Sequence, residues 1–293
     1  MKENCASPLD LARIIQETFV QDGEVWQTID STNNRAKTLV VRPDLPLPFL
    51  VAAEHQTAGR GRGNRRWWTG QGSLAFSVIL APPTQAGKTV GLPSGVTAPQ
   101  NQPKFPEAKR ERPQETAVGF FGLLGALAVC QAVRPLVPPS VPLGLHWPND
   151  VYVAGRKIAG ILVEVAANQR AIFGIGVNVN NTAREAPEEL RPFVTSLRDI
   201  CGSFVDRTDV LVSILRQMES QLAVLSNGAT QLASEADRLC LQKGRRLILE
   251  TEKQRYEGVC RGIDSTGAIL LETSQGLRKF VSGTILRSDS PSE

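Results

Sequence analysis

The sequence has few of the residues that build metal centres, disulfide frameworks or histidine-based catalytic sites. Of its 293 residues only two are histidines, His55 and His146, and none of its five cysteines belongs to a Cys-x-x-Cys pair. A structural zinc site needs four clustered ligands, and a disulfide framework needs an even set of cysteines. The scattered, odd-numbered cysteines argue against both, and the scarcity of histidine argues against a Ser-His-Asp site.

The chain also lacks a secretory signal and long runs of one charge. Its opening segment has no cationic stretch followed by an apolar one and a cleavage site. No apolar run approaches the roughly 18 residues of a membrane span. The net charge of +4 is mild and does not by itself indicate a nucleic-acid partner. We therefore expect a cytoplasmic globular protein, long enough for one large domain and one small one. An organellar protein whose targeting segment is absent from this sequence remains the alternative.

Glycine and arginine are concentrated in one segment, from Gln56 to Gly72, which reads QTAGRGRGNRRWWTGQG. Glycine lets the backbone bend closely around a ligand, and arginine offers paired donors that match phosphate or carboxylate. The two tryptophans suit a flat heterocycle. This segment, called the glycine loop below, is typical of a site for a flat anionic ligand such as a nucleotide. It is equally typical of a basic surface hairpin, and composition leaves the two open.

Hydrophobic patterns predict alternating strands and helices on either side of the glycine loop. We expect a first helix with Pro8 at its first position, a second helix starting at residues 30–34, and a buried helix over 117–133. Strands are expected at 24–29, 49–53, 73–80, 143–147, 151–153, 157–166 and 171–177. The proline-rich stretch 82–116 is predicted to be a flexible insertion.

The last part of the chain has a different hydrophobic pattern. Short strands are expected at 246–250, 255–263, 268–273 and 277–281, and such a series predicts a small β-barrel. We therefore divide the chain into a catalytic domain over residues 1–241 and a C-terminal barrel over 242–293.

Five blocks of the sequence, in this order and at these intervals, resemble the biotin–protein ligases. They are DSTN at 30–33, QTAGRGR at 56–62, WPND at 147–150, RKIAGILVE at 156–164 and GIGVNVN at 174–180. A lone glycine-arginine loop would be a weak signal, but five ordered blocks are a specific one. The likeness extends over nearly the whole chain apart from the insertion.

The resemblance implies a fold and a two-step reaction. The fold is α+β: a mixed, largely antiparallel sheet flanked by helices, with a small C-terminal SH3-like β-barrel. The enzyme would use ATP to convert biotin into biotinoyl-5′-AMP, accompanied by Mg²⁺. It would then transfer biotin to a lysine of the biotin carboxyl carrier protein of acetyl-CoA carboxylase. Only about thirty residues precede Ser31, so we expect the monofunctional form without an N-terminal DNA-binding domain, with neither DNA nor a membrane as partner.

The first step brings a carboxylate to a triphosphate, so fixed cations must offset their repulsion. Arg60, Arg62 and Lys157 would do this, and Lys157 is our choice for the group that touches both the biotin carboxyl and the α-phosphate. Arg62, Lys157 and Asp150 form the expected catalytic set. For Asp150, binding magnesium, accepting a proton from the incoming lysine and merely fixing the turn remain open.

Short polar side chains, among them Ser31, Thr32 and Gln56, suit the ureido head of biotin, although the first two could simply cap a helix. Trp67 would cover the ligands or fill a core position. Asn178 would approach the nucleotide. The full set expected to bind biotin or the adenylate is Ser31, Thr32, Asn33, Gln56, Gly59, Arg60, Gly61, Arg62, Trp67, Lys157, Gly160 and Asn178.

The chain departs from the family pattern at two places. His146 stands where a lysine usually precedes WPND, and Gly63-Asn64 interrupts the arginines of the loop. The nearest alternative function is a lipoate–protein ligase, which shares the fold and the adenylate chemistry. An alternative of another class is a nucleic-acid-binding module that uses the basic loop and the barrel, with steeply salt-dependent binding.

Overall fold

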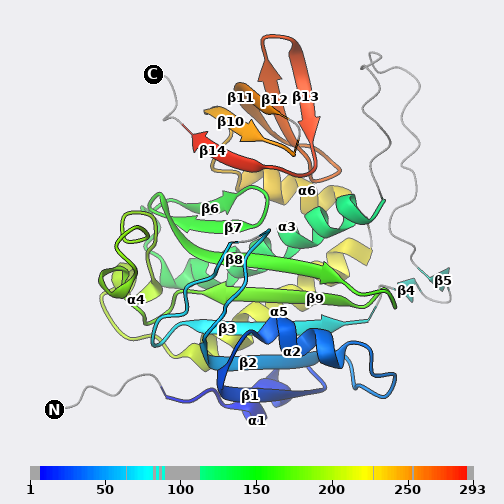
Figure 1. The fold of residues 1–293 in the computed structure, drawn as a ribbon, viewed down its shortest axis with the longest axis vertical. Helices are drawn as coiled ribbons and strands as arrows, with labels where there is room; N and C mark the ends of the chain where they lie inside the picture. The colour runs from blue at the N-terminus through cyan, green and yellow to red at the C-terminus, as the bar shows by residue number, and fades with distance from the viewer. Residues whose placement is uncertain are drawn as a thin grey trace.

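A seven-stranded mixed sheet forms the middle of the molecule (Figure 1). Its order is β1 (Asp22–Ile29), β2 (Phe49–Gln56), β3 (Leu74–Leu80), β9 (Ala171–Val177), β8 (Arg156–Val165), β7 (Asp150–Val153) and β6 (Leu143–His146). β1 and β2 are parallel, and every other neighbouring pair is antiparallel. The expected mixed, largely antiparallel sheet is confirmed. The computed structural model describes residues 7–63, 65–81, 84–85, 88–89, 113–226, 228–252 and 254–288.

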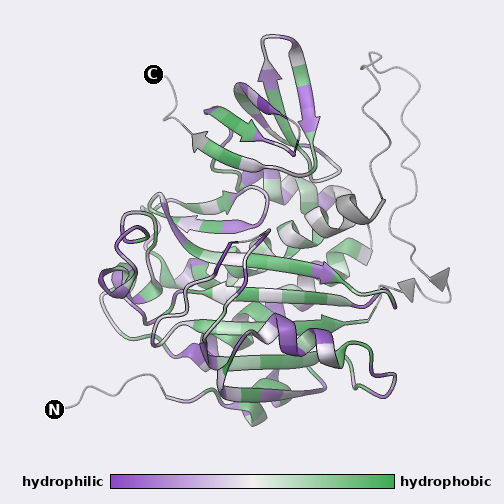
Figure 2. Cartoon of the chain, viewed as in Figure 1, coloured by the Kyte–Doolittle hydropathy of each residue, from purple (hydrophilic) through white to green (hydrophobic). Residues whose placement is uncertain are grey.

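Helices cover both faces of the sheet. They are α1 (Leu11–Glu17), α2 (Thr32–Leu39), α3 (Pro113–Val133), α4 (Leu197–Cys201), α5 (Arg207–Ser226) and α6 (Ala229–Arg238), with 3₁₀ turns at Arg134–Leu136 and Ala183–Glu185. α2 packs on β2, β3 and β9, whereas α3 packs on β8 and also contacts α5. β3 and β9 are buried along their whole length, and Figure 2 shows the apolar colour along these central strands.

Helix α3 passes a length-and-composition test for a membrane span. Its window Gly119–Leu136 has a mean hydropathy of 1.5, and 67% of the window is buried inside the fold. The expectation that no apolar run reaches this length is therefore wrong for α3. A helix that is apolar all round and covered by its neighbours is a core helix.

Two expected boundaries differ from the structure. α1 begins at Leu11, because Asp10 caps it by accepting a hydrogen bond from the Arg13 amide at 3.0 Å, so Pro8 lies before the helix. α3 begins at Pro113, so residues 113–116 are helical rather than part of the insertion. The rest of the insertion lies outside the described residues, except for the two-residue strands β4 (Thr84–Gln85) and β5 (Lys88–Thr89).

The C-terminal unit is a five-stranded antiparallel sheet. Its order is β13 (Gly276–Phe280), β12 (Ile269–Thr273), β11 (Arg255–Ile263), β10 (Arg246–Glu250) and β14 (Thr284–Ser288). The sequence patterns predict the first four of these strands but miss β14. In Figure 1 the unit stands beyond α6, at the end of the central sheet that carries β6.

Candidate active site

A cavity of about 760 Å³ lies on the α2 side of the central sheet. Several parts of the chain line it: the start of α2, the glycine loop, the β6–β8 strands, the neighbouring strands β3 and β9, and the C-terminal unit. The described lining includes Ser31, Thr32, Asn33, Gln56, Arg60, Gly61, Arg62, Arg65, Arg66, Trp67, His146, Asn149, Asp150, Tyr152, Lys157, Gly160, Gly174, Gly176, Glu250, Glu252 and Thr284. Residues of the glycine loop, of Trp147–Asp150 with Lys157, and of Ser31–Asn33 meet in this one cavity, as the sequence predicts for these three clusters.

Three glycines make the floor of the cavity flat. Gly160 on β8 pairs with Gly176 on β9, and Gly174 lies two residues before Gly176 on the same face. A Cβ on Gly174 would lie 1.9 Å from Asn33 Oδ1, and one on Gly176 would lie 2.3 Å from the Trp67 ring. No other residue type fits these close approaches. The glycines thus allow Asn33 and Trp67 to lie directly on the sheet.

One end of the cavity is uncharged and hydrogen-bonded. Gln56 Oε1 accepts from the Thr32 amide at 2.8 Å and from the Thr32 hydroxyl at 3.2 Å. Ser77 Oγ lies 2.8 Å from Thr32 Oγ1 and 2.6 Å from Asn33 Oδ1. Ser31 is the N-cap residue of α2 by position, yet its side chain makes no capping hydrogen bond. This end can recognise a neutral polar group through several short donors and acceptors.

The middle of the cavity holds the Lys157–Asp150 ion pair. Lys157 Nζ lies 2.7 Å from Asp150 Oδ2, and both side chains are half-buried. The same ammonium lies 5.6 Å from the centroid of the Trp67 ring. The Trp67 Nε1–H is buried without a hydrogen-bond acceptor among the described residues. The structure therefore brings the expected lysine, carboxylate and tryptophan together.

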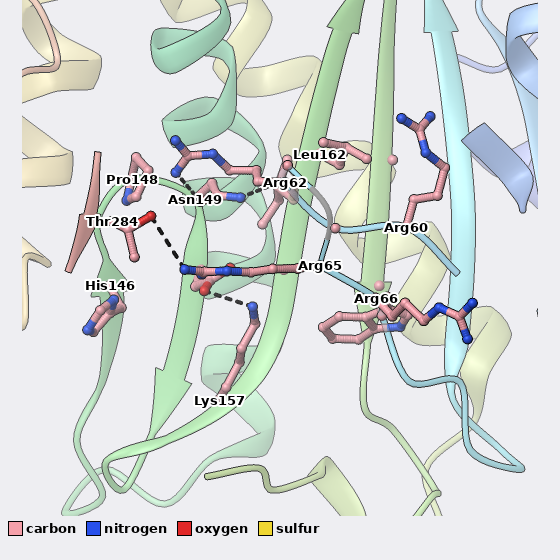
Figure 3. A pocket seen from close by; sticks show the side chains of 18 of the residues that line it. Arg60, Arg62, Arg65, Arg66, His146, Pro148, Asn149, Lys157, Leu162 and Thr284 are labelled. Carbon is pink, nitrogen blue, oxygen red and sulfur yellow. Dashed lines mark hydrogen bonds and ion pairs between the residues drawn. The ribbon is translucent and has the colours of Figure 1, made fainter. Parts of the chain in front are cut away.

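A second cation, Arg62, lies beside this pair. Its Nη1 donates to Asn149 Oδ1 at 3.2 Å, and burial lowers the pKa of its guanidinium. The amide of Asn149 in turn donates to the Ile161 carbonyl on β8. Figure 3 shows Arg62 and Lys157 on the same side of the cavity as Asn149. Two cations held at one place can neutralise a polyanion there.

Arg60 is engaged differently from expectation. Its guanidinium donates to both oxygens of Glu164, Nη1–Oε2 at 3.0 Å and Nη2–Oε1 at 3.2 Å. Glu164 also pairs with Lys37 at 2.7 Å and accepts from Asn33 at 3.0 Å. Burial acts to raise the pKa of Glu164, but these partners hold it below the ordinary value. Arg60 points away from Arg62 in Figure 3, so in this structure it ties the loop to the sheet.

Two expected binding residues do not line the cavity. Asn178 is buried, and its Oδ1 accepts from Asn181 Nδ2 at 2.9 Å because the chain turns away as β9 ends. Gly59 is needed for packing, since a Cβ there would lie 2.6 Å from the Trp67 carbonyl. Gly61 and Gly160 do line the cavity.

His146 and Tyr152 form a stacked pair in the wall, with ring centroids 4.6 Å apart. Burial lowers the pKa of His146 and so disfavours the charged form of its ring. Burial, reinforced by Asp150, raises the pKa of Tyr152 to about 12. At the position where the family pattern has a lysine, this chain therefore has an aromatic ring that stacks on Tyr152.

Sequence patterns missed the wall that the C-terminal unit contributes. Glu250, Glu252 and residues 282–285 line the cavity, and Arg65 Nη2 of the glycine loop donates to Thr284 Oγ1 at 3.4 Å. No local pattern signals a contact across more than 200 residues. Glu164 could have been anticipated, because it lies four residues after Gly160 on a strand and therefore on the same face.

Among the described residues, no group of three or more His, Cys, Asp or Glu side chains is placed to hold a metal ion. The arrangement can instead bind an extended ligand with a neutral polar head, an anionic centre and a flat part.

Comparison with known proteins agrees with this chemistry. Residues 25–94 and 106–180 match the Biotin/lipoate A/B protein ligase family, and residues 244–287 match the Biotin protein ligase C terminal domain. The chain is 31% identical to the Biotin--[acetyl-CoA-carboxylase] ligase of Mycobacterium tuberculosis, with 92% of each chain covered. It is 30% identical to the Bifunctional ligase/repressor BirA of Bacillus spizizenii, covering 89% of this chain and 73% of that protein.

A solved structure is similar over most of the fold. The biotin protein ligase from Aquifex aeolicus in complex with biotin and ATP superposes with a TM-score of 0.72 at 26% identity, covering 92% of this chain and 100% of that one. Family, relatives and structure agree, and the chain belongs to the biotin protein ligase family.

Proposed function

We propose that this protein uses ATP to activate biotin as biotinoyl-5′-AMP and transfers the biotinoyl group to one lysine of a biotin carboxyl carrier domain, that of acetyl-CoA carboxylase. The observation that carries the proposal is the order of chemistry along one cavity. An uncharged hydrogen-bonding end at Thr32 and Gln56 leads to a cationic centre at Lys157 and Arg62, over a glycine floor.

In the first step an oxygen of the biotin carboxylate attacks the α-phosphorus, and the bond from that phosphorus to pyrophosphate breaks. Lys157 reaches the carboxylate and the α-phosphate, and Arg62 offsets the charge of the phosphates. Fixed donors of this kind act where charge develops and need no reorganisation during the reaction. Asp150 keeps Lys157 in place through the 2.7 Å ion pair.

In the second step the lysine amine of the carrier attacks the acyl carbon, and the bond between acyl carbon and AMP oxygen breaks. The amine must be neutral to attack, so its ammonium proton has to move to a base. We assign this proton to Asp150, whose Oδ1 faces Gly160 across the hairpin. Trp67 lies over the centre of the cavity and would keep water from the acyl phosphate.

Mg²⁺ in proteins is commonly held by one or two carboxylates together with substrate phosphates. Asp150 is the carboxylate that pairs with Lys157 in the cavity, and one carboxylate together with substrate phosphates fits that mode. Bound there, the ion would offset the charge of the triphosphate.

Three further assignments belong to this proposal. The C-terminal five-stranded sheet is an SH3-like barrel, the catalytic domain ends near residue 241, and the protein works in the cytoplasm. The matches to a separate C-terminal family from residue 244 support the boundary.

The experiment that tests the first step is ATP–pyrophosphate exchange with biotin or lipoate as the acid. We expect exchange with biotin and none with lipoate. Exchange with lipoate alone would make the protein a lipoate ligase, and exchange with neither would overturn the proposal. Binding of oligonucleotides that weakens steeply with salt, without any exchange, would favour the nucleic-acid alternative.

A further inference from the structure

The C-terminal part of the chain binds the outer edge of the hairpin that carries Asn149 and Asp150. β6 is an edge strand of the central sheet. Its outer side pairs with the segment after α6: the Leu145 amide donates to the Leu239 carbonyl at 2.8 Å, and the Leu241 amide donates to the Leu145 carbonyl at 2.9 Å. A Cβ on Gly144 would lie 2.4 Å from the Leu239 carbonyl, so the two segments are in close contact.

Gln242 extends this pairing with its side chain. Its Oε1 accepts from the Trp147 amide at 3.1 Å, and its Nε2 donates to the Trp147 carbonyl at 3.4 Å. Gln242 is 1% exposed and Trp147 is also 1% exposed. A buried side-chain amide that satisfies both groups of one residue fixes the position and the tilt of that peptide segment.

The indole of Trp147 adds a third hydrogen bond. Its Nε1 donates to the Gly267 carbonyl at 3.1 Å, between β11 and β12 of the C-terminal sheet. Trp147 is the largest fully buried side chain of the protein's described part. The residue two positions before Asn149 and three before Asp150 is thus fixed by Gln242 and the C-terminal sheet.

Beyond Trp147 the same hairpin contacts both site cations. Asn149 accepts from Arg62, and Asp150 pairs with Lys157. From these contacts we propose that Gln242 is a positioning residue for the reaction: through Trp147 it sets where Asn149 and Asp150 hold Arg62 and Lys157. The inference rests on the proposed function, and it gives the C-terminal unit a part in the chemistry besides its share of the cavity wall.

The uncharged end of the cavity does not depend on this connection. Thr32 and Gln56 belong to α2 and β2, which bind each other directly. Loss of the Gln242 hydrogen bonds should therefore misplace the cations and leave the recognition of the biotin head unchanged. A misplacement of about 1 Å can cost on the order of 100-fold in rate.

The test compares Gln242→Met with Gln221→Met in the full-length chain. Gln221 is a matched control: it is a buried glutamine, 3% exposed, whose Nε2 donates to Gln131 and Glu235 among α3, α5 and α6. Both variants lose buried hydrogen bonds and should have lower melting temperatures. Of the two glutamines, only Gln242 is connected to the cavity, through Trp147. Biotin-dependent pyrophosphate exchange is measured well below both melting temperatures.

We expect kcat of Gln242→Met to fall about 10- to 100-fold, with the KM for biotin within about twofold of wild type and Gln221→Met active. Equal kcat in the two variants would overturn the inference, since Gln242 would then be structural only. Gln242→Glu keeps the acceptor for the Trp147 amide, so its kcat should lie between those of the wild type and Gln242→Met. This variant replaces Gln242→Met in the test if Gln242→Met does not fold. A wild-type kcat in Gln242→Glu would also overturn the inference. An inactive wild-type protein would instead refute the proposed function.

Discussion

The Glu164 carboxylate binds the Arg60 guanidinium through two hydrogen bonds, at 3.0 and 3.2 Å, and so joins the glycine loop to strand β8. An arginine held in this bidentate way is committed to its carboxylate. Arg60 therefore orders the start of the loop, and under the proposed function the phosphates would be bound by Arg62 and Lys157. The same carboxylate also holds Lys37 and Asn33, which ties α2 into the arrangement.

This arrangement predicts a pH-dependent difference for Glu164→Gln. The folded-state pKa of Glu164 lies below its ordinary value of 4.5, so its stabilising contribution is full above pH 4.5 and is lost as the pH falls through the lower folded value. Thermal melts should show the variant less stable than wild type at pH 7, with the gap closing below pH 4.5. A gap that stays constant down to acid pH would exclude the assigned role of the carboxylate.

Lys157→Ala should remove adenylate formation while the fold persists. Loss of one fixed donor at a developing charge typically costs about 10²–10³-fold in rate, measured here as biotin-dependent pyrophosphate exchange. Lys279→Ala is the control, because Lys279 also forms an ion pair with a carboxylate, Asp264 at 2.7 Å, but lies in the C-terminal sheet. If both variants keep wild-type exchange, Lys157 is not the activating cation.

Gly176→Ala should disturb Trp67 specifically. The added Cβ would lie 2.3 Å from the indole, so the ring must leave the floor, and we expect the KM for biotin and ATP to rise. In a Trp67→Ala background the same substitution should have little further effect, since residues in contact give non-additive changes. Additive losses in the double variant would mean that Gly176 acts without Trp67.

The glycine loop should become resistant to trypsin when its ligands bind. Arg65 and Arg66 are exposed in this structure, and a loop that closes over an adenylate buries its backbone. Cleavage after Arg62, Arg65 and Arg66, mapped by mass spectrometry, should slow with biotin and ATP together. The same rate with and without ligands would contradict a closing loop.

The local order of the site could be predicted from sequence because each block carries its own signal. Gln56 begins the glycine loop and Lys157 lies on the expected hairpin that β7 and β8 form, and both residues line the cavity together with Arg62 of the loop. The roles of Thr32 and Gln56 as short hydrogen-bonding groups agree with their contacts.

Long-range pairing is the part of the site that the sequence does not show. The sequence predicts that Arg60 offsets the charge of the phosphates, but it does not show Glu164, which folding brings to Arg60 across 104 residues. Gln242 belongs to no recognisable motif. Its hydrogen bond with Trp147 forms only because β6 lies against the segment after α6 in the fold. Asn178 is expected to approach the nucleotide, but in the structure it lies outside the cavity lining and accepts a hydrogen bond from Asn181.

The most direct test of the account is the mass of a carrier domain after incubation. A purified biotin carboxyl carrier domain of acetyl-CoA carboxylase is mixed with biotin, ATP and Mg²⁺, and with either the wild-type protein or Lys157→Ala. We predict that the wild type adds one biotinoyl group to a single lysine and that the variant adds none. A carrier that stays unmodified with the wild type, together with no detectable biotinoyl-5′-AMP, would contradict the central claim.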